Sequence, residues 1–248
     1  YNPKYSHWRG KKSLGDWLSE NGIIGISGVD TRELVKIIRD NQNVLGKITN
    51  FSENLNFERS IEHIVEETKA ENVSLKLNLF GQSRNEYNKR LNESKIVINE
   101  NPALLNILVI DCGIKNSQIR GLLKYNVQLT VVSPNFNFFD GETLIKYHGI
   151  FLSNGPGDPT VSTEVVKRLK NIFKMDIHIP IFGICYGHQL VGLASGNSIG
   201  KMKYGNRGHN IPCNLVGTQK CYITSQNHGY EVLLNQENTE WQELFVNS

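Results

Sequence analysis

The sequence has little of what would indicate a membrane protein, a secreted protein or a nucleic acid-binding protein. Nothing in its 248 residues approaches the ~18 uninterrupted apolar residues that a membrane-spanning helix needs. The 27 Lys and Arg residues against 24 Asp and Glu leave a net charge of +3, which is too small and too scattered to indicate nucleic acid. The charged-then-apolar start of a secretory signal is also missing. We therefore expect a cytoplasmic globular protein that binds neither membranes nor nucleic acids.

Cysteine is scarce, and its spacing excludes two common uses. None of the four cysteines forms a CxxC pair, and their positions suit neither zinc ligands nor a disulfide framework. We therefore expect no bound metal and a reducing compartment in which the thiols stay free. Cys112, Cys213 and Cys221 are interpreted as small buried hydrophobic residues. Cys185 lies in a different context, described below.

Two regions of the chain differ in their pattern of residues. Residues 1 to about 80 mix short apolar runs with one clear amphipathic helix, which Asp30 or Thr31 can cap. Residues 81–101 are polar, charged and rich in Asn, which indicates a surface connection. We place a domain boundary near residue 101.

Residues 101–248 alternate predicted strands with predicted helices. Runs such as LLNILVIDCG and IPIFGIC suit strands that are buried on both faces, and stretches with helical periodicity separate them. This alternation predicts an α/β fold with a parallel sheet flanked by helices. From about residue 197 the chain becomes rich in Gly and Asn with short β-like pieces, which predicts antiparallel additions.

The heptapeptide GICYGHQ, residues 183–189, lies between a predicted buried strand and a predicted helix. A strand-to-helix elbow exposes a nucleophile at the end of a sheet, and flanking glycines are needed because larger side chains would collide in so tight a turn. We expect Cys185 to be the nucleophile, with its thiolate favoured by the helix N-terminus. The backbone N–H of Tyr186 would then face a developing oxyanion. The alternative is a buried structural cysteine between two glycines.

Two further loops lie where they could complete a site. SNGPGDP, residues 153–159, ends another predicted strand, and its glycines let backbone amides approach a ligand closely. Because ligands of parallel sheets bind at the carboxyl ends of the strands, we expect this loop and Cys185 at one edge. SQNHGY, residues 225–230, contains His228, and a lone His in a polar loop is more often structural than catalytic. Taken singly, each loop can be interpreted as an ordinary turn.

Together, GPGDP, GICYGHQ and QNHG resemble the class I, triad-type glutamine amidotransferases. KMKYGNRGHN (201–210) and GVDTREL (28–34) are more specific and resemble the glutaminase part of carbamoyl-phosphate synthetase. In detail, YGNRGHNIPC, TSQNHG and SHW look most like the eukaryotic multifunctional pyrimidine-biosynthesis enzymes. The resemblance covers almost the whole chain. It implies a truncated small-subunit N-terminal α/β domain (1–100) and a larger flavodoxin-like amidotransferase domain (101–248).

The resemblance also implies roles for particular residues. Cys185 would attack the side-chain amide of glutamine, form a γ-glutamyl thioester and release ammonia. An ATP-grasp synthetase partner, expected in the same polypeptide, would combine the ammonia with bicarbonate. ATP and Mg would bind to that partner, so no cofactor is expected on this chain. The amides of Gly155 and Tyr186 would form the oxyanion hole. The residues expected to hold the glutamine are Gly157, Gln189, Asn227, Gly229 and Tyr230.

Two features depart from the family's pattern. The family takes its base and orienting acid from an FHPE-type motif well beyond QNHG, and this sequence reaches WQELFVNS without it. An N-terminal glutamine-contacting segment is missing too, so we expect a fragment truncated at both ends. Tyr186 stands where most members carry Leu. Its amide is the functional group, although the ring could reshape the pocket.

Three other functions fit parts of the sequence. A regulatory amidotransferase-like domain would have lost the nucleophile, and Cys185 is present. A free-standing γ-glutamyl hydrolase would not need GVDTREL and the N-terminal domain that contains it. A flavodoxin-like cofactor-binding module would carry a phosphate loop after its first strand, but DCGIKNSQ has neither a Ser/Thr-rich nor a GxGxxG pattern. A glutaminase is therefore favoured, while the pyrimidine and arginine pathways are not separated.

Overall fold

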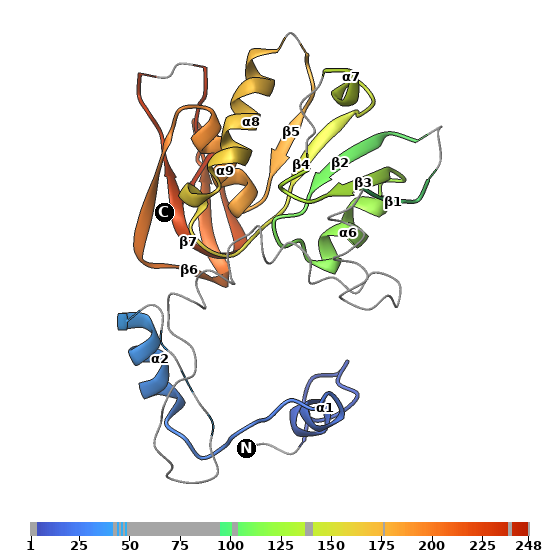
Figure 1. Cartoon of the computed structure of the whole chain (residues 1–248). Coiled ribbons are helices and arrows are strands. Elements are labelled where there is room, and N and C mark those ends of the chain that lie inside the picture. The colour runs from blue at the N-terminus through green and yellow to red at the C-terminus, as the bar shows by residue number, and fades with distance from the viewer. Residues whose placement is uncertain are drawn as a thin grey trace. The chain divides into compact units, whose positions relative to one another are not determined.

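The protein forms two compact units, Tyr1–Ile61 and Glu62–Ser248 (Figure 1). Its structure is a computed structural model, and each unit is described by itself. The residues that the structure describes are 4–41, 44, 46, 48, 95–100, 104–136, 141–175, 177–237 and 240–247. None of the helices in this described part of the chain has the length and apolar character that a membrane span requires.

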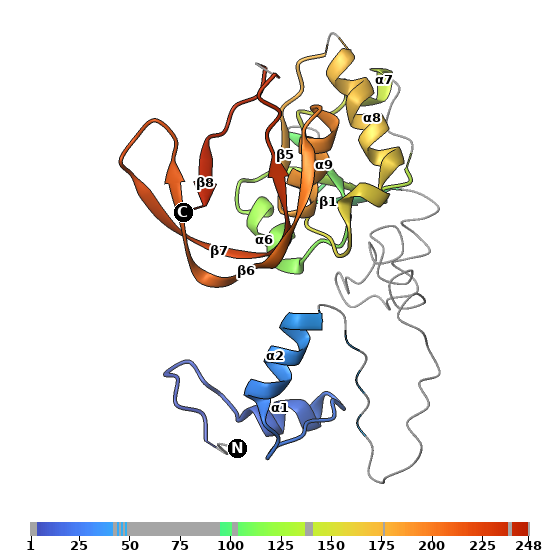
Figure 2. The same cartoon turned by 90° about the vertical axis from the view of Figure 1, so that its left-hand side faces the viewer.

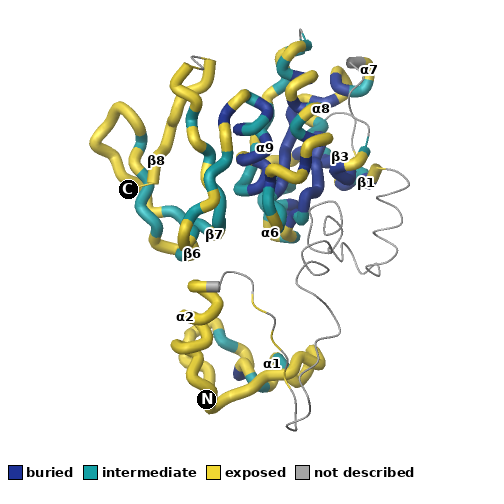
Figure 3. Tube along the Cα trace, turned by 60° about the vertical axis from the view of Figure 1, so that its left-hand side comes forward, coloured by how far each residue is buried: buried dark blue, intermediate teal, exposed yellow. Residues whose placement is uncertain are grey.

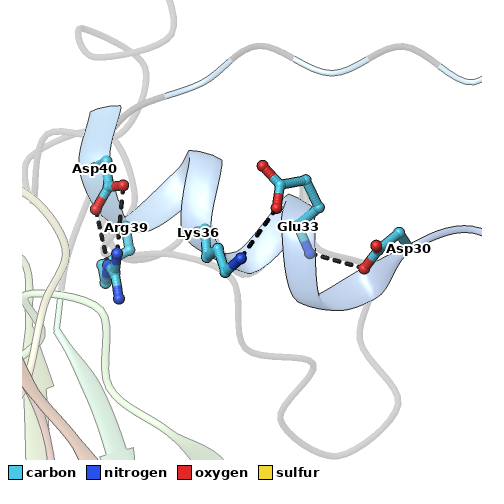
Figure 4. A network of polar contacts seen from close by, with 5 residues as sticks. All are labelled: Asp30, Glu33, Lys36, Arg39 and Asp40. Atoms are coloured by element: carbon cyan, nitrogen blue, oxygen red, sulfur yellow. Dashed lines mark hydrogen bonds and ion pairs between the residues drawn. The ribbon is translucent and has the colours of Figure 1, made fainter.

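The first unit contains two helices, α1 (Leu14–Glu20) and α2 (Thr31–Asn41). Ser13 caps α1, because its hydroxyl accepts a hydrogen bond of 3.1 Å from the backbone N–H of Asp16. The sequence predicted α2 as well as its cap. The carboxylate of Asp30 accepts a hydrogen bond of 2.9 Å from the backbone N–H of Glu33 (Figure 4).

Helix α2 is polar on one side and apolar on the other. Its ion pairs join Glu33 to Lys36 at 3.2 Å and Arg39 to Asp40 at 2.8 Å, both on the exposed surface (Figure 4). Exposed pairs of this kind contribute little to stability. The apolar stripe of the helix is also exposed within the described residues. It consists of Leu34, Ile37 and Ile38, which are 45%, 41% and 53% exposed.

A five-stranded sheet forms the centre of the second unit, with the strand order β1-β3-β2-β4-β5. The four strands β2 to β5 run parallel, and β1 is added antiparallel to β3 at one edge. This arrangement confirms the predicted parallel sheet. The strands are β1 (Ile96–Ile98), β2 (Asn106–Ile110), β3 (Gln128–Val132), β4 (Gly149–Leu152) and β5 (Ile181–Gly183).

Helices cover both faces of this sheet. The side chains of β2 alternate, so that Leu108 and Ile110 pack in one apolar cluster with α8 and α9, whereas Val109 packs in a second cluster with α6. Figure 3 shows this burial concentrated in the sheet and the helices beside it. The connecting elements are α6 (Asn116–Leu123), α7 (Gly141–Leu144), the 3₁₀ turn η1 (Pro159–Val161), α8 (Thr163–Lys174) and α9 (Tyr186–Ala194).

A second, antiparallel sheet follows α9, in the strand order β7-β6-β8. Its strands are β6 (Ser198–Leu215), β7 (Cys221–Leu233) and β8 (Phe245–Asn247). The predicted antiparallel additions are thus confirmed, although β6 and β7 are longer than the short pieces that we expected. Both strands pack against α9, as the two views in Figures 1 and 2 show.

The structure differs from the sequence-based expectation at strand β1. Residues 81–101 were predicted to be a surface connection, but Ile96–Ile98 pair with β3 and bury two of their three side chains. Ile96 and Ile98 enter the core because the segment alternates correctly for an edge strand. The boundary predicted near residue 101 therefore falls after the first strand of the sheet. The remaining division into domains stays a prediction.

Candidate active site

Cys185 lies at the elbow between β5 and α9, as predicted. Its backbone has φ 53° and ψ −106°, a conformation that residues with a side chain rarely adopt. Strained backbone of this kind persists where the surrounding packing holds it, and it is concentrated at functional sites. The side chain of Cys185 is partly buried and partly accessible to solvent.

The glycines on either side of the elbow are required by close packing. A Cβ added to Gly187 would overlap the carbonyl oxygen of Leu152 at the end of β4. One added to Gly183 would overlap the backbone of Gly187. The collision predicted from the sequence is therefore present, with β4 leaving no room at Gly187 and the start of α9 leaving none at Gly183.

The loop 153–159 lies directly beside the elbow. The backbone N–H of Gly187 donates to the carbonyl of Ser153 at 3.1 Å, and that of Ile184 donates to the carbonyl of Leu152 at 3.0 Å. A Cβ on Gly155 would overlap the carbonyl oxygen of Cys112, so only glycine allows this close approach. Gly157 has φ +86°. The predicted meeting of the two loops at one sheet edge is thus confirmed.

Strand β7 closes a further side of the elbow. The thiol of Cys185 lies 3.7 Å from the carbonyl oxygen of Asn227, within hydrogen-bonding distance for sulfur. The side-chain amide of Gln189, which is 5% exposed, donates to the carbonyl of Tyr230 at 2.9 Å. Gly229 lies between these two contacts on the same strand. The predicted site residues of α9 and β7 are therefore neighbours.

The helix N-terminus was expected to favour the thiolate of Cys185, and the structure adds a larger effect in the opposite direction. Burial raises the pKa of this thiol above its ordinary value. A hydrogen bond from the backbone of Tyr186 and the positive charge of Lys115 act in the opposite direction, and they do not outweigh the burial. The sequence-based prediction considered the effect of the helix N-terminus on the pKa of Cys185 but not the effect of burial.

His228 makes its side-chain hydrogen bonds to residues of its own strand, β7. Its two ring nitrogens lie 2.9 Å from the carbonyl of Tyr230 and 2.9 Å from the side-chain oxygen of Gln226. In the part of the chain that the structure describes, the side-chain hydrogen bond recorded for the sulfur of Cys185 goes to Asn227 and involves no imidazole. These contacts agree with the structural interpretation of His228.

Several contacts of the site could not be predicted from the motifs. The side chain of Tyr186 is 1% exposed, and its hydroxyl lies 2.7 Å from that of Ser162. A hydrogen bond to the carboxylate of Asp158 contributes to the raised pKa of Tyr230, after the larger effects of burial and of the charge of Asp158. Of the residues that make these contacts, only Tyr186 stood out in the sequence, because it replaces the usual Leu. Lys115 and Ser162 lie in segments with no distinctive pattern.

The geometry defines a class of protein, and the comparison with known families agrees with it. Residues 108–248 match the glutamine amidotransferase class-I family, and this range is more than half of the chain. The chain therefore belongs to the class-I glutamine amidotransferases. Residues 1–48 match the CPSase domain of the carbamoyl-phosphate synthase small chain.

The curated relatives combine these two parts. Multifunctional protein ura1 of Schizosaccharomyces pombe is 40% identical over 100% of this chain and 11% of its own length. Multifunctional protein URA2 of Saccharomyces cerevisiae is 41% identical over 100% of this chain and 11% of its own length. The arginine-specific small chain of carbamoyl phosphate synthase from Yarrowia lipolytica is 41% identical over 98% of this chain and 52% of its own length. The chain thus spans about half of the small chain and a much smaller share of the multifunctional proteins.

Proposed function

We propose that this chain is the glutaminase part of a glutamine-hydrolysing carbamoyl-phosphate synthetase. The observation that carries the proposal is the elbow itself. Cys185 stands at a strained strand-to-helix turn with the loop 153–159 and strand β7 hydrogen-bonded around it. Membership of the class-I amidotransferases supports glutamine as the substrate. The match of residues 1–48 and the names of the relatives support the synthetase.

In this mechanism the thiolate of Cys185 attacks the side-chain amide carbon of glutamine. The C–N bond then breaks, ammonia leaves with an added proton, and a γ-glutamyl thioester remains. Water hydrolyses the thioester to glutamate and restores the thiol. We assign the stabilisation of the oxyanion to the backbone N–H groups of Gly155 and Tyr186, which lie on the two adjoining loops.

The remaining site residues are assigned to substrate binding. Gln189 and Tyr230 are already joined by a hydrogen bond, and the carbonyl of Asn227 is next to the thiol, so a glutamine bound here would lie along β7. Gly157, with its positive φ, and Gly229 leave backbone groups uncovered by side chains. We propose that these five residues hold the glutamine. We further propose that the base comes from the family's His and Glu motif elsewhere in the complete protein.

The ammonia would be used by an ATP-grasp synthetase region, in the same polypeptide or in a separate subunit. We propose that ATP and Mg bind to that region and not to this chain. The relatives include both multifunctional proteins and arginine-specific small chains at about 40% identity, so either pathway fits the proposed reaction. We also propose a cytoplasmic location, which the free state of all four cysteines supports.

The test of the proposed function is the variant Cys185→Ser in the complete protein. Glutamine-dependent carbamoyl phosphate synthesis should be abolished, because only the glutaminase needs a thiolate. Synthesis from free ammonia should be largely retained. The matched control is Cys213→Ser, which removes a half-buried thiol from strand β6 and should change neither activity. Normal use of glutamine by Cys185→Ser would show that the assigned elbow is wrong.

A further inference from the structure

We propose that Tyr186 is a positioning residue that fixes the loop 153–159 to the helix carrying the nucleophile. The proposal rests on the proposed function and adds a residue whose side chain does not touch the substrate. The backbone of Tyr186 follows Cys185 directly, and its side chain is buried in the apolar cluster that includes residues of β4 and α8. One residue thus joins the elbow to the interior of the unit.

The hydroxyl of Tyr186 ends where the loop turns into α8. It lies 2.7 Å from the hydroxyl of Ser162, which is 2% exposed, and it donates to the carbonyl of Asp158 at 3.4 Å. Ser162 is the residue at which η1 ends and α8 begins. A buried hydroxyl pair of this kind is costly to break, because each group left alone would lose a hydrogen bond without gaining water.

The ring of Tyr186 also contacts the loop closer to the reacting atoms. A Cβ built on Gly155 would lie 3.2 Å from the Cγ of the Tyr186 ring, so the α-carbon of Gly155 rests against that ring. Tyr186 therefore touches the loop near Gly155 through its ring and near Asp158 through its hydroxyl. The two backbone amides assigned to the oxyanion, those of Gly155 and Tyr186, are held in one packed assembly.

A second tyrosine holds the same loop from the opposite side. The carboxylate of Asp158 interacts with the hydroxyl of Tyr230 on β7, whose pKa is raised by burial and by this carboxylate, and accepts a hydrogen bond of 2.9 Å from the backbone N–H of Thr160. The loop is consequently fastened to α9 through the carbonyl of Asp158 and to β7 through its carboxylate. Removing the Tyr186 hydroxyl releases only the first attachment. The loop then keeps its fold but loses its alignment with the elbow.

The expected effect is on the chemical step, because the oxyanion forms only in the transition state. Tyr186→Phe, made in the complete protein, should lower kcat for glutamine hydrolysis about tenfold and change KM less than kcat. Ser162→Ala removes the partner hydroxyl and should have a similar effect. The double variant should be no slower than Tyr186→Phe, because the Ser162 hydroxyl acts on the loop only through the Tyr186 hydroxyl.

Alkylation of Cys185 by iodoacetamide separates positioning from a general disturbance of the elbow. This reaction needs the thiolate but not the oxyanion donors, so its rate in Tyr186→Phe should equal that of the parent protein. The matched control is Tyr147→Phe, because Tyr147 is another buried tyrosine, and its hydroxyl interacts with Thr130 on β3. Its kcat should be unchanged.

Three results would overturn the positioning role. They are an unchanged kcat in Tyr186→Phe, a loss of kcat matched by an equal loss of alkylation, and independent losses that add up in the double variant. Ser162→Ala serves as a second test if the tyrosine variant does not fold. Failure of the proposed function looks different, because glutamine-dependent activity would then survive Cys185→Ser whatever residue stands at position 186.

Discussion

At the scale of single residues, burial and nearby positive charge act in opposite directions on the thiol of Cys185, and burial is the larger effect. Burial raises its pKa, while the N–H of Tyr186 and the ammonium of Lys115 lower it. Lys115 follows β2, which is separated from β5 in the sheet by one strand. A motif search centred on GICYGHQ does not reach this residue, because only the packing of parallel strands brings the two loop ends together.

The role of Lys115 can be measured by the reactivity of the thiol. Lys115→Met removes a cation that favours the thiolate, so the pKa of Cys185 should rise further. Alkylation of Cys185 at neutral pH should slow by up to about fivefold, the range expected for an exposed charge pair. The rate is followed by mass spectrometry of the Cys185 peptide, because Cys221 is exposed, contrary to the burial predicted from the sequence, and also reacts.

Lys124→Met is the matched control for this experiment. It makes the same change of charge at the opposite end of α6, at a lysine that is not among the groups that shift the pKa of Cys185. The difference between the two variants should shrink in high salt, because salt screens exposed charges. Equal slowing in both variants would rule out a specific role for Lys115.

At the scale of elements, the elbow depends on two glycines that have no space around them. Gly187→Ala places a Cβ against the carbonyl of Leu152, which belongs to a sheet and cannot move aside. Overpacking of this kind costs about 1–3 kcal/mol of unfolding free energy. Urea unfolding monitored by circular dichroism should show the loss as a lower midpoint with an unchanged slope.

Gly121→Ala provides the opposite expectation in the same unit. Gly121 lies within α6, and a Cβ there meets nothing within 4 Å. Alanine should therefore stabilise the helix by up to about 1 kcal/mol, because glycine is the poorer helix former. The packing argument for the elbow would be contradicted if Gly187→Ala had the same free energy of unfolding as the parent protein while Gly121→Ala behaved as expected.

The elements themselves were largely predictable, and the exceptions have physical causes. The strands β2 to β5 and the helix α8 follow from long apolar runs and clear periodicity. Strand β1 was missed because three residues, Ile96–Ile98, in a polar segment give too short a pattern, and its burial depends on pairing with a distant strand. The glycine collisions could be expected at the elbow. The hydroxyl contacts of Tyr186 and Tyr230 could not, since they join side chains from loops whose course the sequence does not specify.

At the scale of the whole molecule, the two units raise the question of what the first one does. Residues 1–48 match a domain of the synthetase small chain and carry no group that we assign to catalysis. We propose that this unit holds the glutaminase against the synthetase and couples the two sites. A test by deletion of the first unit must keep strand β1, because a deletion up to residue 100 would remove part of the sheet.

The deletion should therefore end at residue 94. The protein that begins at Lys95 keeps β1 and should retain a folded amidotransferase unit, while losing complex formation and glutamine-dependent synthesis. A protein that begins at residue 101 should be less stable than this, because Ile96 and Ile98 leave the core. Thermal unfolding and pull-down of the synthetase measure the two effects separately. If the protein that begins at Lys95 kept its full glutamine-dependent synthesis, the first unit would not have the proposed docking role.

The packing of Gly155 on Cys112 has a further consequence. Cys112 is fully buried, and its carbonyl leaves no room for a side chain on Gly155. Burial together with the charge of Asp111 raises the pKa of the Cys112 thiol. We expect a thiol reagent to reach this sulfur slowly, after the loop 153–159 that packs on Cys112 has moved away. The labelling rate of Cys112, which lies two strands away from the nucleophile, would therefore report how often this loop opens. In one labelling experiment, the slow reaction of Cys112 would measure the rate of loop opening. The fast reaction of Cys185 would measure the fraction of its thiol that is ionised.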